Sequence, residues 1–338
     1  MYIDLRSDTV TKPTKAMLEA MYSARVGDDV FAEDETVIQL ETKAAQLFGM
    51  EAGLFCPSGT MTNQIAIRCH TQLGDELICD ETAHIYNYEG GGIASNSGVQ
   101  AKLIKGDRGQ LTATMIKDCI NADYDWLTKT SLVCLENTVN KAGGSVYTLQ
   151  QIADIKQLCE QEQLKLHLDG ARIFNAIIQA AYSAKDIGKQ FHSISVCLSK
   201  GLGAPVGSVL LGSSAFIKKA RKVRKVFGGG MRQAGYIAAA GIYALDNHIT
   251  RLKDDHERAK QLEKTLLSLN YIEQVLPVET NIVIFKLSDK YTTDGFVEQL
   301  AKHHIKVSVF GKQTIRMVTH LDYTDDMLGE TIKQLQSL

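Results

Sequence analysis

Residues 192–207 read HSISVCLSKGLGAPVG. The β-branched and apolar run up to Leu198 predicts a buried strand, and the glycines and proline after Lys200 predict a turn. Residues 208–211 are again apolar and predict the next strand. Lys200 therefore stands where a strand passes into a loop. Burial at such a place disfavours the ammonium charge, as it does in lysines that form Schiff bases.

Two other interpretations compete for this segment. Gly201, Gly203 and Gly207 suggest a dinucleotide-binding loop, but their spacing is not that of GxGxxG and Lys200 precedes the turn. Lysines are mostly solvated, so an ordinary surface lysine explains the segment equally well when it is taken alone. The choice depends on a second residue.

The second residue is Asp169, which ends the apolar segment LKLHLD at residues 164–169. In open parallel sheets, ligand-contacting residues sit at the carboxyl ends of the strands. Enzymes that use pyridoxal phosphate (PLP) need a carboxylate to keep the pyridine nitrogen protonated, so Asp169 together with Lys200 predicts a PLP site. Ala171 offers a methyl contact to one ring face, and Arg172 offers a fork for a carboxylate. A helix N-cap is the alternative for Asp169.

The composition excludes several classes of protein. The chain has 338 residues, enough for two domains, and 44% of them are hydrophobic and 22% charged. Its net charge of −2 gives no field that would attract nucleic acid or anionic lipid. We expect no membrane span, and the first residues lack a signal-peptide pattern, so a cytoplasmic protein is expected. The seven cysteines have no CxxC spacing and predict reduced core thiols, and we expect no metal site.

The order of the predicted elements indicates an α/β fold. Strands alternate with helices up to residue 211, which predicts right-handed βαβ units and a mainly parallel central sheet flanked by helices. The remaining elements predict a smaller C-terminal α+β domain. We expect an N-terminal arm at residues 1–13, a large PLP-binding domain at 14–247 and a small domain at 248–338. The predicted strands include 76–80, 100–105, 131–136, 281–287, 307–310 and 314–318, and the predicted helices include 37–48, 112–121, 149–161, 216–227, 237–245, 249–269, 293–303 and 325–335.

Two segments are candidates for binding a phosphate. Ser58, Gly59 and Thr60 stand where an apolar run passes into a predicted helix, and the free N–H groups of a helix N-terminus bind phosphate. Ordinary N-capping uses the same residues without a ligand. Further along the chain, Lys225 and Arg232 flank three glycines with positive charge suited to a phosphate. Most of the other lysines nearby predict a solvated helix face.

His84 follows the predicted strand at residues 76–80. An imidazole in that place could stack on a cofactor ring and act as a base, because its unperturbed pKa lies near neutrality. A solvated loop histidine is the alternative.

Assembled in order, these motifs resemble the low-specificity L-threonine aldolases. These enzymes are PLP-dependent lyases of fold type I, the aspartate aminotransferase fold. The resemblance runs from Leu5 to nearly the last helix. The segments that carry it are Ser7, Ser58–Thr60, His84, Asp169–Arg172, Ser199–Pro205, Gly228–Gln233 and Arg316–His320.

The resemblance also implies roles for single residues. At the cofactor these are Lys200 on the aldehyde, Asp169 on the pyridine nitrogen, His84 on the ring, and Gly59 and Thr60 at the phosphate. At the substrate carboxylate they are Ser7, Arg172 and Arg316. Family members assemble as dimers or tetramers with shared active sites, which implies that Lys225 and Arg232 of a neighbouring copy reach the phosphate.

One position departs from the family pattern. Where the family reads Glu-Asn-Thr-His-Asn, this chain has Val139 in place of the histidine. That histidine is associated with the substrate hydroxyl, so we expect weak discrimination between threo and erythro substrates.

The activity expected from the resemblance is retro-aldol cleavage of L-threonine or L-allo-threonine to glycine and acetaldehyde. His84 is the candidate base that removes the hydroxyl proton, directly or through a water. Another fold type I enzyme, such as a β-eliminating lyase or an aminotransferase, is the nearest alternative. A non-catalytic PLP-binding module is an alternative from a different class.

Overall fold

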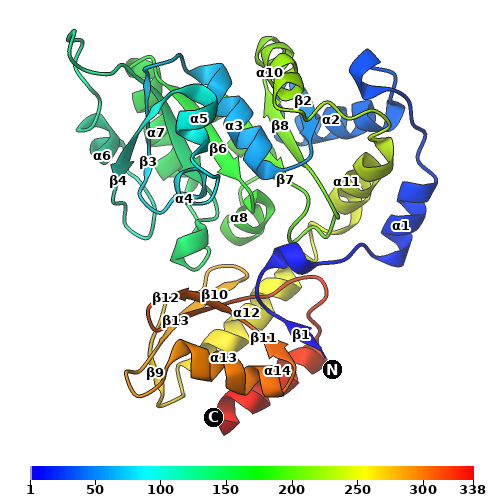
Figure 1. The fold of residues 1–338 in the computed structure, drawn as a ribbon, viewed down its shortest axis with the longest axis vertical. Coiled ribbons are helices and arrows are strands. Elements are labelled where there is room, and N and C mark those ends of the chain that lie inside the picture. The colour runs from blue at the N-terminus through cyan, green and yellow to red at the C-terminus, as the bar shows by residue number, and fades with distance from the viewer. Residues whose placement is uncertain (1) are drawn as a thin grey trace.

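The computed structural model describes residues 2–338, which form a larger and a smaller body (Figure 1). The larger body is built on a sheet with the strand order β2-β8-β7-β6-β5-β3-β4. Neighbouring strands from β7 to β4 are parallel, whereas β8 runs antiparallel to both β7 and β2. The predicted mainly parallel sheet is therefore confirmed. Its strands are β2 (Ala52–Cys56), β3 (Glu76–Asp80), β4 (Gln100–Ile104), β5 (Thr130–Glu136), β6 (Lys165–Gly170), β7 (Ser193–Cys197) and β8 (Ser208–Gly212).

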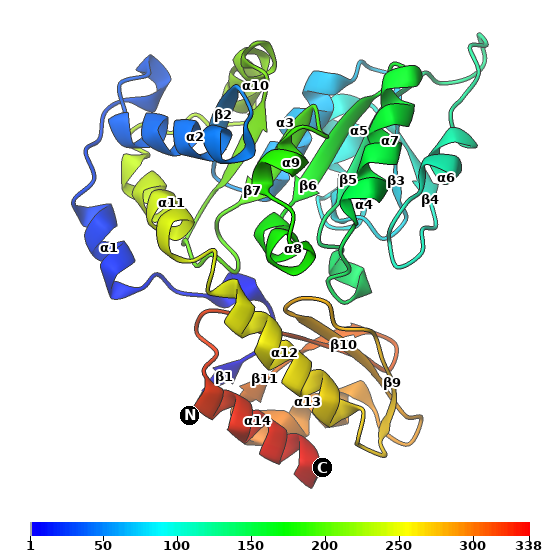
Figure 2. The same ribbon diagram turned by 180° about the vertical axis from the view of Figure 1, so that it is seen from behind.

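Helices cover both faces of this sheet. Figure 1 shows α3, α4, α5 and α10 on one face, and Figure 2 shows α2, α7, α9 and α11 on the other. The helices of the larger body are α1 (Lys15–Tyr22), α2 (Glu35–Phe48), α3 (Gly59–His70), α4 (His84–Asn87), α5 (Gly92–Ser97), α6 (Ala113–Lys117), α7 (Leu149–Gln161), α8 (Ile173–Ala180), α9 (Ala184–Gly188), α10 (Ser214–Val226) and α11 (Gly235–Asn247). Short 3₁₀ turns lie at Asp8–Val10, Asp29–Phe31 and Asn140–Ala142.

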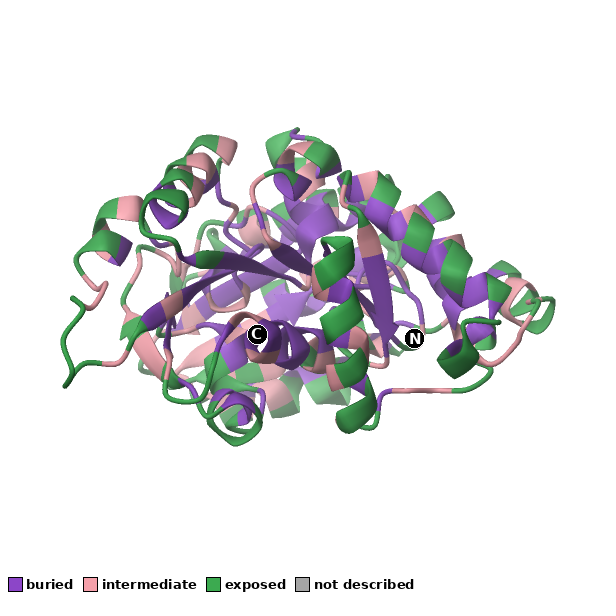
Figure 3. Cartoon of the chain, turned by 90° about the horizontal axis from the view of Figure 1, so that it is seen from above, coloured by how far each residue is buried: buried purple, intermediate pink, exposed green. Residues whose placement is uncertain are grey.

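The sequence of each strand explains why both faces are covered. In β2, Phe55 packs in the core cluster that includes α2 and α11, whereas Leu54 and Cys56 pack with α3 and α10. Successive side chains of a strand point to opposite faces, so a sheet buried on both sides needs apolar residues at nearly every position. Figure 3 shows the resulting buried strands between helices whose outer faces are exposed.

The smaller body contains an antiparallel sheet with the order β12-β13-β10-β9. Its strands are β9 (Ile272–Val275), β10 (Ile282–Leu287), β12 (Ser308–Gly311) and β13 (Thr314–Val318), and its helices are α12 (Leu252–Leu266), α13 (Thr293–Lys302) and α14 (Asp325–Ser337). The N-terminal strand β1 (Ile3–Asp4) pairs with β11 (Ile305–Lys306), and Ile3 and Leu5 belong to the core of this body. The first described strand, β1, and the C-terminal helix α14 therefore both lie in the smaller body (Figure 1).

The sequence pattern did not reveal β1, β9 or β11. β1 and β11 have two residues each, too few for a periodic pattern, and β9 is partly exposed. Within residues 2–338, no helix combines the length and the apolarity needed to cross a bilayer.

Candidate active site

A cavity of about 260 Å³ lies between the two bodies, beyond the carboxyl ends of β3, β5, β6 and β7. Segments far apart in the sequence meet there: the N-terminal segment, the loops after these strands, and the smaller body. The lining residues are Ser7, Thr9, His84, Tyr88, Glu136, Asn140, Ala171, Arg172, Lys200, Phe310 and Arg316. Ser7, His84, Ala171, Arg172, Lys200 and Arg316 are residues that the sequence predicted for the site.

Lys200 reaches the cavity from the turn that follows β7. Its Nζ donates a hydrogen bond to Cys197 Sγ at 3.5 Å. Burial lowers the pKa of Lys200, but the neighbouring Cys197, Asp8 and Asp169 outweigh it and the net pKa is raised. Burial therefore disfavours the ammonium charge, as expected from the sequence, but the charges brought near by folding reverse the net direction.

Asp169 is the last residue but one of β6, pairs with Ser195 of β7 and is buried. Its Oδ1 accepts a hydrogen bond from the backbone N–H of Ala171 at 3.1 Å, and its Oδ2 accepts one from the Asn63 side chain at 3.0 Å. Ligand atoms of His84, Glu89 and Asp169 all lie within 4.8 Å of one another. The sequence-predicted lysine, aspartate and histidine thus share one corner of the sheet edge, where His84, Glu89 and Asp169 could also hold a cation.

His84 begins α4 and is held by two carboxylates. Its backbone N–H donates to Glu136 at 2.8 Å, and its Nδ1 lies 3.0 Å from Glu89 Oε1. Burial lowers the pKa of His84, but the hydrogen bond to Glu89 and the charge of Asp169 outweigh it, so the net pKa lies above its ordinary value. Because Nδ1 is occupied by Glu89, Nε2 is the nitrogen free to accept a proton from a ligand.

Glu136 is a site residue that sequence reasoning missed. It ends β5, pairs with Asp169 on β6, and lines the cavity. Its carboxylate accepts the backbone N–H groups of His84 and Asn140, each at 2.8 Å. Burial and the charge of Asp169 raise the pKa of Glu136 to about 7. A polar residue at the end of a predicted buried strand was the available signal.

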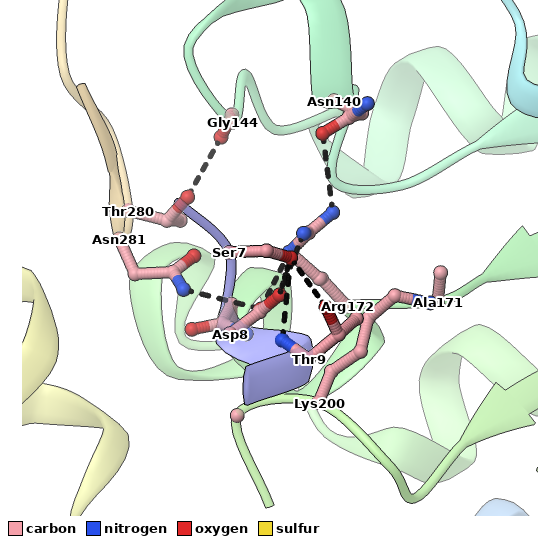
Figure 4. A network of polar contacts seen from close by, with 12 residues as sticks. Ser7, Asp8, Thr9, Asn140, Gly144, Ala171, Arg172, Lys200, Thr280 and Asn281 are labelled. Atoms are coloured by element: carbon pink, nitrogen blue, oxygen red, sulfur yellow. Dashed lines mark hydrogen bonds and ion pairs between the residues drawn. The ribbon is translucent and has the colours of Figure 1, made fainter. Parts of the chain in front are cut away.

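At the other end of the cavity, Arg172 is fixed by Asp8 (Figure 4). The guanidinium donates from Nε to Asp8 Oδ2 at 2.7 Å and from Nη2 to Oδ1 at 2.8 Å, and both side chains are buried. Burial raises the pKa of Asp8, but Arg172 outweighs it and lowers the pKa to about 2. Nη1 of Arg172 is left to face Asn140 Oδ1 at 3.4 Å.

Arg316 comes from β13 of the smaller body. Its Nη1 donates to the same Asn140 oxygen at 3.0 Å, its Nη2 donates to the backbone carbonyl of Arg6 at 2.9 Å, and its guanidinium lies 4.5 Å from the centre of the Phe310 ring. Its Nε is buried and has no hydrogen-bond partner among residues 2–338. Burial and the charge of Arg172 lower the pKa of Arg316 to about 10. Two guanidinium groups thus face one carboxylate, and the surplus positive charge favours an anionic ligand.

Ser7 lies beside these arginines. Its Oγ accepts from the backbone N–H of Thr9 at 3.2 Å and so caps the short turn that carries Asp8. Thr9, Tyr88 and Phe310 also line the cavity, although no pattern in the sequence singled them out. Asn140, the last residue of the family pattern that contains Val139, lines it as well.

The predicted phosphate-binding segment, Ser58–Thr60, stands at the start of α3 and does not line the cavity. Ser58 Oγ caps α3 by accepting from the backbone N–H of Met61 at 3.1 Å, so the other N–H groups of the first turn are free for a ligand. A Cβ at Gly59 would lie 3.5 Å from Ser208 Oγ, a buried oxygen without a partner in the described part of the chain. Ser58 and Thr60 are exposed. A helix N-terminus with spare donors at the edge that carries Lys200 fits the phosphate of PLP.

Lys225 and Arg232 are absent from the lining of this cavity. Arg232 Nη1 donates to Asp28 Oδ2 at 2.8 Å, and its side chain is 54% exposed. The structure therefore does not bring these two residues to the site of their own chain.

Val139 does not line the cavity either. Its side chain is buried in the core, where a Cβ added at Gly109 would lie 2.5 Å from Val139 Cγ1. Position 139 therefore does not offer the substrate contact that the family pattern led us to expect, and the adjacent Asn140 faces the cavity instead.

Comparison with known proteins identifies the family that this chain resembles. Over residues 4–290 the chain matches the family described as beta-eliminating lyase. It is 40% identical to low-specificity L-threonine aldolase 1 of Arabidopsis thaliana, with 99% of this chain and 95% of that protein covered. It is also 40% identical to the low specificity L-threonine aldolase of Escherichia coli strain K12, with 97% of this chain and 96% of that protein covered.

Among solved structures, the threonine aldolase of Leishmania major superposes with a TM-score of 0.86 at 19% identity, covering 99% of both chains. The similarity confirms the fold class expected from the sequence.

Proposed function

The chain belongs to the beta-eliminating lyase family and to the low-specificity L-threonine aldolases, and from this premise we propose that it is a lyase that cleaves L-threonine and L-allo-threonine to glycine and acetaldehyde. One observation carries the proposal. A single cavity joins Lys200 to Arg172 and Arg316, so an amino acid could present its amino group to the lysine and its carboxylate to the guanidinium pair.

PLP is the cofactor that these residues suit. We assign Lys200 to its aldehyde, Asp169 to its pyridine nitrogen, His84 and Ala171 to the two ring faces, and Ser58, Gly59 and Thr60 to its phosphate. When bound, PLP supplies an electron-withdrawing ring that takes up the electron pair released when the Cα–Cβ bond breaks.

The chain's own residues orient the substrate. Nη1 of Arg172 and Nε of Arg316 are the guanidinium nitrogens left for a carboxylate, and Ser7 adds a hydroxyl beside them. Holding the carboxylate at this end fixes which bond of Cα stands perpendicular to the cofactor ring, and that bond is the one weakened.

His84 is the proposed base for the β-hydroxyl proton. His84 lines the cavity, and Glu89 holds its Nδ1, which leaves Nε2 free. Neutral His84 can therefore accept a proton on Nε2, and Glu89 stabilises the resulting cation. Only the neutral imidazole can act, and the raised pKa of His84 places that form at higher pH than for an ordinary histidine.

A β-eliminating lyase is the second candidate, because that is the description of the matching family. An aminotransferase would use the same cofactor residues. Incubation of the purified protein with L-threonine separates the three activities. Acetaldehyde and glycine without added keto acid indicate the aldolase, ammonia indicates elimination, and turnover that requires a keto acid indicates transamination.

We further propose that the protein is a homo-oligomer, a dimer or a homotetramer, in which Lys225 and Arg232 of one copy reach the phosphate of the other. Both lie outside their own cavity and border the loop of Gly228–Gly230. Phe31 and Val226 nearby are 70% and 83% exposed, which is unusual for large apolar side chains and suits an interface. Light scattering combined with gel filtration tests the oligomeric state.

A reducing compartment, the cytoplasm, is the proposed location. In the described residues all seven cysteines are free thiols and six of them are buried, which suits a protein that is not exposed to oxidising conditions. Cell fractionation followed by immunodetection tests the location.

A further inference from the structure

Asp169 stands at one end of a continuous chain of hydrogen bonds, most of them buried. Asn63 of α3 forms its first link. The Asn63 Nδ2 donates to Asp169 Oδ2 at 3.0 Å and to Glu89 Oε1 at 2.9 Å. All three side chains are buried. One amide group therefore serves both the aspartate proposed for the pyridine nitrogen and the glutamate that holds His84.

The chain continues between α3 and the sheet. Asn63 Oδ1 lies 3.1 Å from Nε2 of His167 on β6, and Nδ1 of His167 lies 2.8 Å from Oγ of Ser193 on β7. The same hydroxyl lies 2.8 Å from Nε2 of His70, at the end of α3. The chain thus runs from the carboxyl edge of the sheet to its amino edge.

The direction of every link follows from the carboxylates at one end. Ionised carboxylates accept hydrogen bonds and cannot donate them, so the nitrogen of Asn63 must face Asp169 and Glu89 and its oxygen must face His167. His167 must then carry its proton on Nε2, which leaves Nδ1 as an acceptor for the Ser193 hydroxyl. The Ser193 hydroxyl already donates its only proton to Nδ1 of His167, so it can only accept from His70, and Nε2 of His70 must be the donor.

Both histidines are in the neutral form that this assignment requires. Burial lowers the pKa of His167 to about 4, and burial lowers the pKa of His70 well below its ordinary value. Every donor of the chain consequently points toward Asp169 and Glu89. Hydrogen bonds aligned in this way polarise one another, so the chain stabilises the negative charge at its end more than an isolated amide would.

We propose that Asn63, His167 and Ser193 are positioning residues that hold the Asp169 carboxylate, ionised and correctly oriented, against the pyridine nitrogen of PLP. The proposal rests on the proposed function, because it assigns Asp169 that role. None of the three residues lines the cavity, so they act through Asp169 and not on the substrate.

The test compares His167→Leu with His167→Gln. Leucine removes both ring nitrogens, whereas glutamine can still donate to Asn63 with its amide nitrogen and accept from Ser193 with its oxygen. We expect His167→Leu to raise the PLP dissociation constant, measured by equilibrium dialysis of the holoenzyme, roughly 10-fold, and to lower kcat by a similar factor with KM unchanged. This is the loss expected when Asn63, no longer held by His167, loses its hydrogen bond to the charged Asp169 carboxylate. His167→Gln should restore most of both.

Two further variants guard against a merely structural effect. His192→Leu is the matched control: His192 starts the neighbouring segment, and its Nδ1 accepts from the backbone N–H of Leu166 at 3.0 Å outside the chain described above. It should leave the PLP dissociation constant unchanged. Ser193→Ala removes one oxygen from the chain and gives a nearly isosteric variant if His167→Leu does not fold. It should weaken PLP binding in the same direction by about 2- to 3-fold.

A double-mutant cycle on PLP affinity tests whether His167 acts through Asp169. If His167 acts through Asp169, His167→Leu should change the PLP dissociation constant little in the Asp169→Asn background. Additive effects in the cycle, or equal effects of His167→Leu and His192→Leu, would overturn the proposal while leaving the role of Asp169 intact. Wild-type turnover and PLP affinity in Asp169→Asn alone would instead refute that role, and the positioning role with it.

Discussion

The two ends of the cavity are built in different ways. At the cofactor end, Asp169 and Glu136 lie at the ends of adjacent parallel strands of one sheet, and Lys200 and His84 follow the ends of β7 and β3. At the carboxylate end, the guanidinium pair belongs to two bodies, and the residues that hold it come from the N-terminal turn and from the loop after β5.

This difference has a chemical consequence. Negative groups surround Lys200 and His84 and raise the pKa of both side chains. Positive groups dominate the other end, where Arg172 lowers the pKa of Asp8 and contributes, with burial, to the lowered pKa of Arg316. A zwitterionic amino acid matches this polarity, because its ammonium and carboxylate ends face opposite charges. The cofactor end depends on one sheet, whereas the carboxylate end depends on how two bodies dock.

The largest effect should come from the cofactor end. Lys200→Ala removes the amine that we assign to the PLP aldehyde, and no other amine lines the cavity in the described residues. We expect the visible absorbance of bound PLP to change and threonine cleavage to fall below detection, because no residue replaces the lysine. Reduction of the purified variant with borohydride, followed by mass spectrometry, checks this. A PLP adduct at wild-type occupancy would contradict the assignment.

Next in size is the ion pair that anchors the carboxylate end. Asp8→Asn leaves Arg172 buried without its counter-charge, which costs on the order of 3–5 kcal/mol of unfolding free energy. The pKa of Asp8 is lowered from 3.8 to about 2, so its contribution is complete above pH 3.8 and is lost as the pH falls toward 2. Denaturant unfolding of wild type and variant across this range measures both effects.

The control for this prediction is Asp4→Asn, which removes an ion pair with the half-exposed Arg6. It should cost about 0–1 kcal/mol. Equal losses for the two variants would mean that the Asp8 pair does not anchor the site.

A smaller effect is expected where the smaller body meets the substrate. Arg316→Lys keeps the charge and loses the planar fork, so KM for L-threonine should rise roughly 10-fold while kcat changes less. Steady-state kinetics of acetaldehyde release measure the two constants. Lys312→Arg, on the exposed turn before β13, is the control and should change neither. An unchanged KM in Arg316→Lys would make Arg316 a structural cation.

The pH dependence of kcat/KM tests the negative surroundings of His84 at the cofactor end. Because Glu89 raises the pKa of His84, kcat/KM should rise with pH through an inflection above 6.5, the ordinary pKa of histidine. Glu89→Gln should move that inflection to lower pH, and Glu81→Gln, at an exposed acid nearby, should not. An inflection that stays in place in Glu89→Gln would show that another group is titrating.

The smallest effect on activity should come from Val139→His. The position faces the core, so the ratio of kcat/KM for L-threonine and L-allo-threonine should stay within about 2-fold of wild type. The larger side chain should instead destabilise the protein by about 1–3 kcal/mol through overpacking. A shifted ratio without loss of stability would show that position 139 reaches the substrate.

Local sequence patterns were sufficient to establish the fold class and much of the cofactor end. Alternation of strands and helices is a local pattern, and in a parallel sheet it forces strand ends to one edge, so Lys200, Asp169 and His84 could be grouped from the sequence alone. Local capping and periodicity fixed some helix boundaries: α7 begins and ends at the predicted residues, whereas the helix predicted at 112–121 ends at Lys117 and the one predicted at 249–269 spans Leu252–Leu266. Two-residue strands such as β1 and β11 carry no such pattern.

Contacts between segments far apart in the sequence determine which residues form the carboxylate end of the cavity and which surround Asp169. Asp8 and Arg172 are 164 residues apart, and Asn140 and Arg316 are 176 apart, so no local signal connects them. The raised pKa of Lys200 likewise depends on which charges folding brings near it, whereas burial alone would lower it. Glu136, Asn63 and His167 act through contacts between elements, and the interactions of a buried polar group are set by its neighbours in space rather than by its neighbours in sequence.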